Sequence, residues 1–241
     1  MPDTEFPKLK RPPLKEALVD IQLRDELPAS ILSEFKAPKG FPVAKTMRRG
    51  QFQFKMDKDQ PALAEVLAEG ILGWRYETDD GSAVVLLRRN GMTYSIQKNY
   101  PGWDALRQAA RNVWREFLAA SGTVNVSRLA ARYINAISIP LGADYDEYLT
   151  TAPQIPKSIP QVVNGFMQRV LVPFLEDAAT AIITQTLEMP TTLAVLDIDV
   201  FAGCSLPGGS EDIWPRLDRL RNIADRIFFS SLTEKVIDSY R

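Results

Sequence analysis

The sequence predicts an α+β fold in which a large antiparallel sheet is packed by two long helices. Apolar and polar residues alternate with strand periodicity in several stretches. Two other stretches, 103–119 and 213–228, carry apolar residues at helical spacing. The turns at 79–81 and 90–91 have the Asp-Gly and Asn-Gly composition of antiparallel hairpins. With 241 residues, 45% of them hydrophobic, the chain is long enough for one large compact domain.

The first half of the chain begins with an extended arm, a strand and a short helix. Residues 1–13 are polar and proline-rich, and residues 17–23 alternate as a half-buried strand does. Pro28 then opens a short helix with Leu32 and Phe35 on one face. The elements expected next are strands at 51–56, 74–78, 83–89 and 92–98 and a long helix at 103–119.

One segment of the first half has two interpretations. Asp59 and Pro61 are typical of a helix start, and Gly70 is typical of a helix end. Leu63 and Leu67 between them lie at helical spacing. The segment is therefore expected to be a helix or, equally, a mobile excursion from the fold.

The second half begins with the stretch 127–140, SRLAARYINAISIP, which reads as a long central strand. A loop is expected at 202–209, and Ser231 with Glu234 fits a capping box for a last short helix. The other elements expected here are a short helix at 144–149, a proline-rich link at 153–160, strands at 162–174, 178–187 and 192–201, and a long helix at 213–228.

Each half therefore reads as strand, short helix, strands and long helix. This order predicts a pseudo-duplicated β-α-β-β-β-α unit, and the sheet should have about eight to ten strands. The arm would be residues 1–13, the first unit 14–122 and the second unit 123–241, with the two units forming one compact domain.

Composition excludes several kinds of chemistry. The chain has no histidine, so histidine-dependent nucleophilic catalysis, histidine general bases and histidine metal ligands are absent. Cys204 is the single cysteine and can form no disulfide within the chain. The polar N-terminus is unlike a signal peptide and no apolar run is long enough for a membrane span, so we expect a cytoplasmic protein without membrane contact.

Several expected strands carry apolar residues on both faces, as in 83–87 and 194–196. A strand with two apolar faces is covered on both sides. The second face would meet a ligand, a second copy of the chain or another protein, or else loops and extra helices cover it. We expect a protein partner or a homodimer.

Asp197 and Asp199, in LDIDVF, form the sharpest local pattern. On a strand they share one face about 7 Å apart, which suits a divalent cation, and Asp20 is a possible third carboxylate. A metal-dependent enzyme built on this pair is one hypothesis. The alternative is that both carboxylates are structural, either solvated or paired with Arg132.

Arg132 and Asn135 lie in the central strand. Arg132 alternates with apolar residues, and a buried arginine requires a carboxylate partner. It would bind an anion or form an internal ion pair at the junction of the two halves, and the ion pair is favoured. No complete catalytic motif is present, so no catalytic residue, metal or cofactor is assigned.

Nucleic-acid binding is a further hypothesis with little support. Arg48, Arg49, Arg88 and Arg89, together with the arginines of the 103–119 helix, would supply a basic surface. The stacking platforms for bases would be Trp74, Tyr76 and Tyr94. A net charge of −1 argues against it, and nucleic acid is not expected as a partner.

Five segments in order, PPLKEALVDIQL, YPGWDAL, RYINAISIP, LDIDVF and LRNIADRIFFSSLTEKVI, resemble a sporadically distributed prokaryotic family of similar length. The resemblance spans nearly the whole chain and implies no activity and no catalytic residues. A patchy distribution suggests mobile operons with accessory or antitoxin-like components. The favoured hypothesis is therefore a non-enzymatic binding protein.

Overall fold

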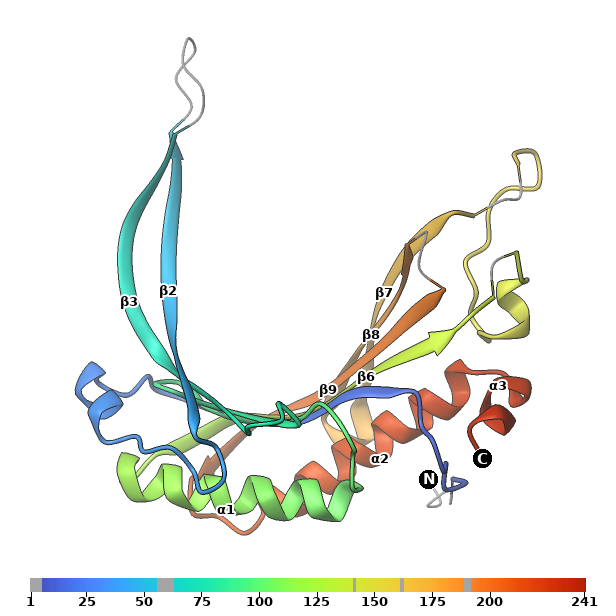
Figure 1. Cartoon of the computed structure of the whole chain (residues 1–241). Helices are drawn as coiled ribbons and strands as arrows, with labels where there is room; N and C mark the ends of the chain where they lie inside the picture. The colour runs from blue at the N-terminus through green and yellow to red at the C-terminus, as the bar shows by residue number, and fades with distance from the viewer. Residues whose placement is uncertain (1–5, 56–62, 141, 161–162, 189–191) are drawn as a thin grey trace.

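The computed structural model shows an α+β protein built on one large antiparallel sheet, which confirms the predicted class and sheet type. It describes residues 6–55, 63–140, 142–160, 163–188 and 192–241. Within these residues the sheet has nine strands in the order β2-β3-β4-β5-β1-β6-β9-β8-β7. The sheet curves into a deep U, whose two arms are β2–β3 and β7–β8, with helices beneath its base (Figure 1).

The first half contributes five strands. A short 3-10 helix, η1 (Ala29–Ser33), follows β1, in agreement with the expected short helix after Pro28. The long helix α1 (Trp103–Ser121) ends this half. The strands are β1 (Leu14–Leu23), β2 (Val43–Lys55), β3 (Leu63–Glu77), β4 (Ala83–Arg88) and β5 (Gly91–Ile96).

The second half contributes four strands and α2 (Ile213–Ser231). Two short 3-10 helices, η2 (Tyr145–Glu147) and η3 (Leu175–Asp177), lie between strands, and α3 (Glu234–Ser239) ends the chain. The strands are β6 (Asn125–Ser138), β7 (Gly165–Phe174), β8 (Ala179–Glu188) and β9 (Leu193–Pro207).

The two halves meet at the centre of the sheet, where β1 pairs antiparallel with β6. Val19 lies opposite Ala131 in this pairing, and Asp20 lies opposite Ala130. Because side chains alternate along a strand, this register puts Val19 and Ala131 on one face and Asp20 and Ala130 on the other. The first face is the one that α1 and α2 cover.

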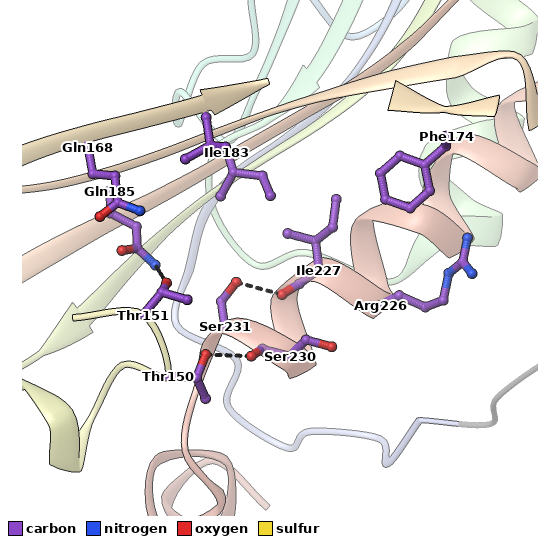
Figure 2. Close-up of a pocket in the computed structure, with 11 residues that line it drawn as sticks. Thr150, Thr151, Gln168, Phe174, Ile183, Gln185, Arg226, Ile227, Ser230 and Ser231 are labelled. Atoms are coloured by element: carbon purple, nitrogen blue, oxygen red, sulfur yellow. Dashed lines mark hydrogen bonds between the residues drawn. The ribbon is translucent and has the colours of Figure 1, made fainter. Parts of the chain in front are cut away.

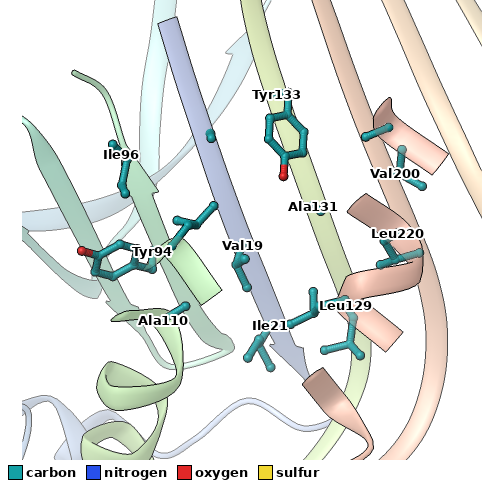
Figure 3. Close-up of a cluster of buried hydrophobic side chains, with 14 of the residues drawn as sticks. Val19, Ile21, Tyr94, Ile96, Ala110, Leu129, Ala131, Tyr133, Val200 and Leu220 are labelled. Atoms are coloured by element: carbon teal, nitrogen blue, oxygen red, sulfur yellow. The ribbon is translucent and has the colours of Figure 1, made fainter. Parts of the chain in front are cut away.

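The core lies between the sheet and the helices (Figure 3). Ile21 and Leu129 of the central strands are fully buried there, in the same core cluster as Ala110 of α1 and Leu220 of α2. Burying a side chain of this size is worth about 1.5–3 kcal/mol. The two helices are also tied to each other, because Arg107 of α1 donates a hydrogen bond to Asp218 of α2 at 2.7 Å.

The turn between β4 and β5 forms the expected hairpin, for a partly different reason. Gly91 has a φ of 140°, whereas Asn90 is not in the positive-φ region. A Cβ at Gly91 would stand 2.1 Å from the carbonyl oxygen of Ile21. Glycine is therefore needed here because β1 approaches the turn closely, as well as for the turn itself.

The helix expected near residues 59–70 is wrong in its described part. Asp59 and Pro61 lie outside the described residues, but Leu63 begins β3, whose ladder with β2 runs from Lys55–Leu63 to Val43–Glu77. Pairing with a long neighbouring strand overrides the helical spacing of this segment, since cross-strand hydrogen bonds outweigh a weak local propensity.

Two smaller predictions at the C-terminal end are also wrong. The loop expected at 202–209 is strand as far as Pro207, because β9 continues along β6 to the pair Asn125–Pro207. The capping box is absent, since α3 begins after Thr233 with no side-chain cap. The Ser231 hydroxyl donates instead to the carbonyl of Ile227, one turn back in α2.

Candidate functional site

The concave face of the sheet is the side opposite to α1 and α2, and in Figure 1 no helix lies over it. Its residues follow from the strand registers, because each alternates with a core residue. At the base of the U they include Glu16, Leu18, Asp20 and Gln22 on β1, Thr93 and Ser95 on β5, Arg128, Ala130, Arg132 and Ile134 on β6, and Val195, Asp197 and Asp199 on β9.

Asp20 is the hub of a charged network on this face. Its Oδ1 accepts hydrogen bonds from Arg88 Nη2 at 2.5 Å and from Thr93 Oγ1 at 2.6 Å. Its Oδ2 accepts from Gln22 Nε2 at 2.9 Å and from Arg128 Nη1 at 3.3 Å. Four donors from β1, β4, β5 and β6 therefore satisfy one carboxylate that is 10% exposed.

Arg128 connects the hub to Asp199 of β9, and Arg132 forms a separate pair with Asp197 beside it. Arg128 Nη2 lies 3.3 Å from Asp199 Oδ2, and its guanidinium stacks 4.5 Å from the ring centre of Phe201. Arg132 donates two hydrogen bonds to Asp197, from Nε to Oδ1 at 2.8 Å and from Nη2 to Oδ2 at 2.5 Å. Three guanidinium groups thus face three carboxylates on this floor, so their formal charges cancel.

The electrostatics differ between the two aspartates of LDIDVF. Burial raises the pKa of Asp199, and Arg128 and Arg132 only partly oppose that effect. The hydrogen bonds to Asp197 raise the pKa of Arg132. Asp197 is thus firmly held in an ion pair, whereas Asp199 is the least well satisfied carboxylate of the network.

The predicted site residues fall on two different faces. Arg132, Asp197, Asp199 and Asp20 are together on the concave face, whereas Asn135 points to the helix side and donates to the Leu196 carbonyl at 3.3 Å. The carboxylates face guanidinium groups rather than one another. Among the described residues, no group of three or more histidine, cysteine or acidic residues is placed to hold a metal ion.

The residues considered for nucleic-acid binding do not form one surface. Tyr76 and Tyr94 are 4% and 7% exposed and belong to the core, so the stacking interpretation is wrong for them. Trp74 donates its indole N–H to the carbonyl of Leu32 on the same side.

The arginines are similarly dispersed. Arg88 points to the concave face, and Arg89 donates to the Leu27 carbonyl. Arg107 pairs with Asp218 of α2, and Arg111 pairs with Glu211, just before α2 begins. Each of these cations has an acceptor, so they add little positive potential for a phosphate backbone.

An apolar strip lies along the edge strand β7. Met167 and Leu171 are 74% and 61% exposed and share the concave side of β7, and Leu175 beyond its end is 86% exposed. Val170, on the other side of the same strand, is 40% exposed. Large apolar side chains on a sheet edge are uncommon unless the edge has a partner.

A hollow of about 380 Å³ opens on the helix side of β7 and β8, against the end of α2 (Figure 2). Gln185 is 3% exposed and donates to the Thr151 hydroxyl at 3.3 Å, while its Oε1 has no hydrogen-bond partner among the described residues. The hydroxyls of Thr150 and Ser231 are occupied by backbone carbonyls of α2. The hollow therefore offers one buried acceptor in apolar surroundings.

Sequence reasoning missed the role of Arg88 and Arg128 in the network. Both alternate with core residues of their strands, as Arg132 does, and that alternation was the available signal. Their pairing with Asp20 required the strand order, which places β4 and β6 on either side of β5 and β1.

Within the described residues, no helix has the length and apolar character needed to cross a membrane. Comparison of the chain with family models, with curated proteins and with solved structures found no match.

Proposed function

We propose that the chain is a non-enzymatic binding protein whose concave sheet face and β7 edge form the surface for a protein partner. The observation that carries the proposal is the one-sided placement of the helices. Both α1 and α2 pack beneath the sheet, and the face between the arms has no helix over it (Figure 1).

The chemistry of this face favours a protein over a nucleic acid. At the base of the U, Arg88, Arg128 and Arg132 are each paired with an aspartate, so this floor offers balanced charges and hydrogen-bonding groups. The exposed Met167 and Leu171 add apolar area at one side. Protein interfaces combine such an apolar patch with a polar surround, whereas a phosphate backbone requires uncompensated cations.

The partner that fits the edge best is a second copy of this chain. β7 is the last strand of the sheet, and its outer side has no neighbouring strand among the described residues. A twofold axis beside β7 would pair it with the same strand of another copy and bring Met167 and Leu171 against their equivalents. An exposed edge strand is a template for pairing with another chain, and twofold dimers are the commonest closed oligomers.

The pseudo-duplication is part of the same proposal. The strand sequence β1-β5-β4-β3 in one direction from the centre corresponds to β6-β9-β8-β7 in the other. If residues 14–122 and 123–241 are related units, the pair β1–β6 lies on their internal twofold axis, with residues 1–13 as an arm. A role as an accessory or antitoxin-like component of a mobile prokaryotic operon rests on the resemblance of the sequence alone.

Hydrogen exchange measured at low and high protein concentration tests the proposal. The β7 amides Met167–Val172 should exchange more slowly at high concentration, because a second copy protects them, while those of β5 should not change. If the β7 amides exchange at the same rate at all concentrations, a second copy of the chain is excluded as the partner. Enzymatic turnover that depends on Asp197 and Asp199 would contradict a non-enzymatic function.

A further inference from the structure

A second hollow, larger than the one beside Gln185, lies on the helix side of the sheet, away from the concave face. It has a volume of about 720 Å³ and opens between the start of α1, the middle of α2, β6 and the segment that precedes β1. This volume is within the range of about 300–1,000 Å³ that small-molecule sites occupy. The hollow also lies where the two halves of the chain meet, a common position for ligand sites.

Aromatic rings form much of its wall. Phe228 and Phe229 of α2 meet edge to face with centroids 5.2 Å apart, and Phe6 stacks on Phe229 at 4.7 Å with an interplanar angle of 3°. Tyr100 meets Tyr133 edge to face at 6.4 Å on the other side. Such walls favour a flat ligand, because ring faces and edges are the surfaces on which planar molecules pack.

Tyr133 contributes a buried hydroxyl group to the hollow, beside Tyr100. Its side chain comes from the central strand β6, and the residue is 9% exposed. Its hydroxyl is buried and meets no partner at ordinary hydrogen-bond geometry among the described residues, although it interacts with the Tyr100 hydroxyl; burial raises the pKa of Tyr133, and Tyr100 adds to that effect. A buried hydroxyl that lacks a well-aligned partner is incompletely satisfied, so a ligand atom that accepts or donates a hydrogen bond here would be favoured.

A carboxylate and a guanidinium stand on the α2 side of the hollow. Arg221 and Asp225 pair at 2.8 Å, and their side chains are 38% and 23% exposed. Burial raises the pKa of Asp225 to about 6 although Arg221 lowers it, so the carboxylate is poorly solvated. Asp225 can therefore gain from an additional N–H donor.

Two lysines of the segment before β1 add positive charge to the lining of the hollow. Lys8 and Lys10 line it and are exposed, and with Arg221 they outnumber Asp225 as its charged groups. A ligand that suits all these groups has a flat ring with nitrogen donors and acceptors and, in addition, an anionic group.

We propose that this hollow is a nucleotide site, in which the base packs among Tyr133, Phe228 and Phe229 and the phosphate meets Lys8 and Lys10. Tyr133 and Asp225 form hydrogen bonds with polar atoms on the edge of the base. The site is independent of the proposed partner surface, which lies on the opposite side of the sheet.

Titration calorimetry with the four ribonucleoside 5′-monophosphates and the four free nucleosides tests the proposal on the full chain. At least one monophosphate should bind, and more tightly than its nucleoside. Tyr133→Phe should weaken both forms about three- to tenfold, as expected for the loss of one hydrogen bond. Lys8→Ala with Lys10→Ala should weaken the monophosphate and leave the nucleoside unchanged.

Arg132→Ala, on the concave face, is the control and should bind as the wild-type chain does. Absence of binding by all eight compounds to the wild-type chain would overturn the proposal. So would binding that is unaffected by both Tyr133→Phe and the lysine pair. The lysines are exposed, so their double variant keeps the fold and provides a test even if Tyr133→Phe does not fold.

Discussion

Arg128 on β6 donates a hydrogen bond to Asp20 on β1, Nη1 to Oδ2 at 3.3 Å, across the line where the two halves of the sheet meet. The two side chains are 25% and 10% exposed. The pair therefore joins the first half of the chain to the second on the concave face, in the same place where Val19 and Ala131 join them on the core face.

Asp20→Ala should destabilise the fold by about 2–4 kcal/mol, because it leaves Arg88 and Arg128 without their buried acceptor. Asp197→Ala is the matched control. It removes the partner of Arg132, which is 41% exposed, and should cost about 1 kcal/mol or less. Urea unfolding of both variants measures the two losses in the free energy of unfolding. Equal losses would contradict the central role of Asp20 among these charged groups.

Asp225 should make stability depend on pH. Burial raises its folded-state pKa from 3.8 to about 6. The folded chain therefore holds the proton more tightly than the unfolded chain, and this group lowers the free energy of unfolding as pH rises from about 4 to about 6. Asp225→Asn should remove that slope and stabilise the fold at pH 7 by on the order of 1–3 kcal/mol, less the weak pairing with Arg221.

Chemical denaturation of the Asp225→Asn chain at a series of pH values measures this effect. The wild-type and variant curves should converge below about pH 4, where the carboxyl group is protonated in both states. A variant that is less stable than the wild type at pH 7 would mean that the ion pair with Arg221 outweighs burial.

Gly91→Ala should be strongly destabilising, by about 3 kcal/mol or more. The new Cβ would lie 2.1 Å from the Ile21 carbonyl oxygen at a φ of 140°, and no flexible side chain can move to relieve the contact. Gly203→Ala in β9 is the control, since its nearest neighbour is the Ser127 carbonyl oxygen at 4.0 Å. Thermal unfolding should separate the two, and similar melting temperatures would contradict the proposed close contact between β1 and the turn.

The sequence predicted the class of fold and most strands, because alternation and turn composition are local signals. It failed for the start of β3, where the helical spacing of Leu63 and Leu67 loses to a ladder with β2. It also failed for the end of β9, which continues along β6 to Pro207. Both errors arise where pairing with another strand determines the local structure, because the sequence does not show which strand is the partner.

The candidate site residues divide in the same way, into features that local patterns predict and features that depend on the tertiary structure. The face shared by Asp197 and Asp199, and the alternative of an ion pair for Arg132, could be argued from strand periodicity. The contribution of Arg88 and Arg128 depends on strand order, and the meeting of Tyr133 with Asp225 depends on how α2 crosses β6. Neither arrangement can be predicted from the spacing of these residues along the sequence.

Light scattering of the purified chain over a wide concentration range tests the central claim most directly. The account predicts that the mass approaches twice 27.0 kDa at high concentration. Leu171→Glu, which places a charge on the exposed β7 edge, should hold the mass at that of a single chain. Ile71→Glu makes the same kind of change on β3, where Ile71 is 43% exposed, and should leave the dimer intact. A mass near 27.0 kDa at every concentration, or a dimer that Leu171→Glu does not disturb, would contradict the proposed surface.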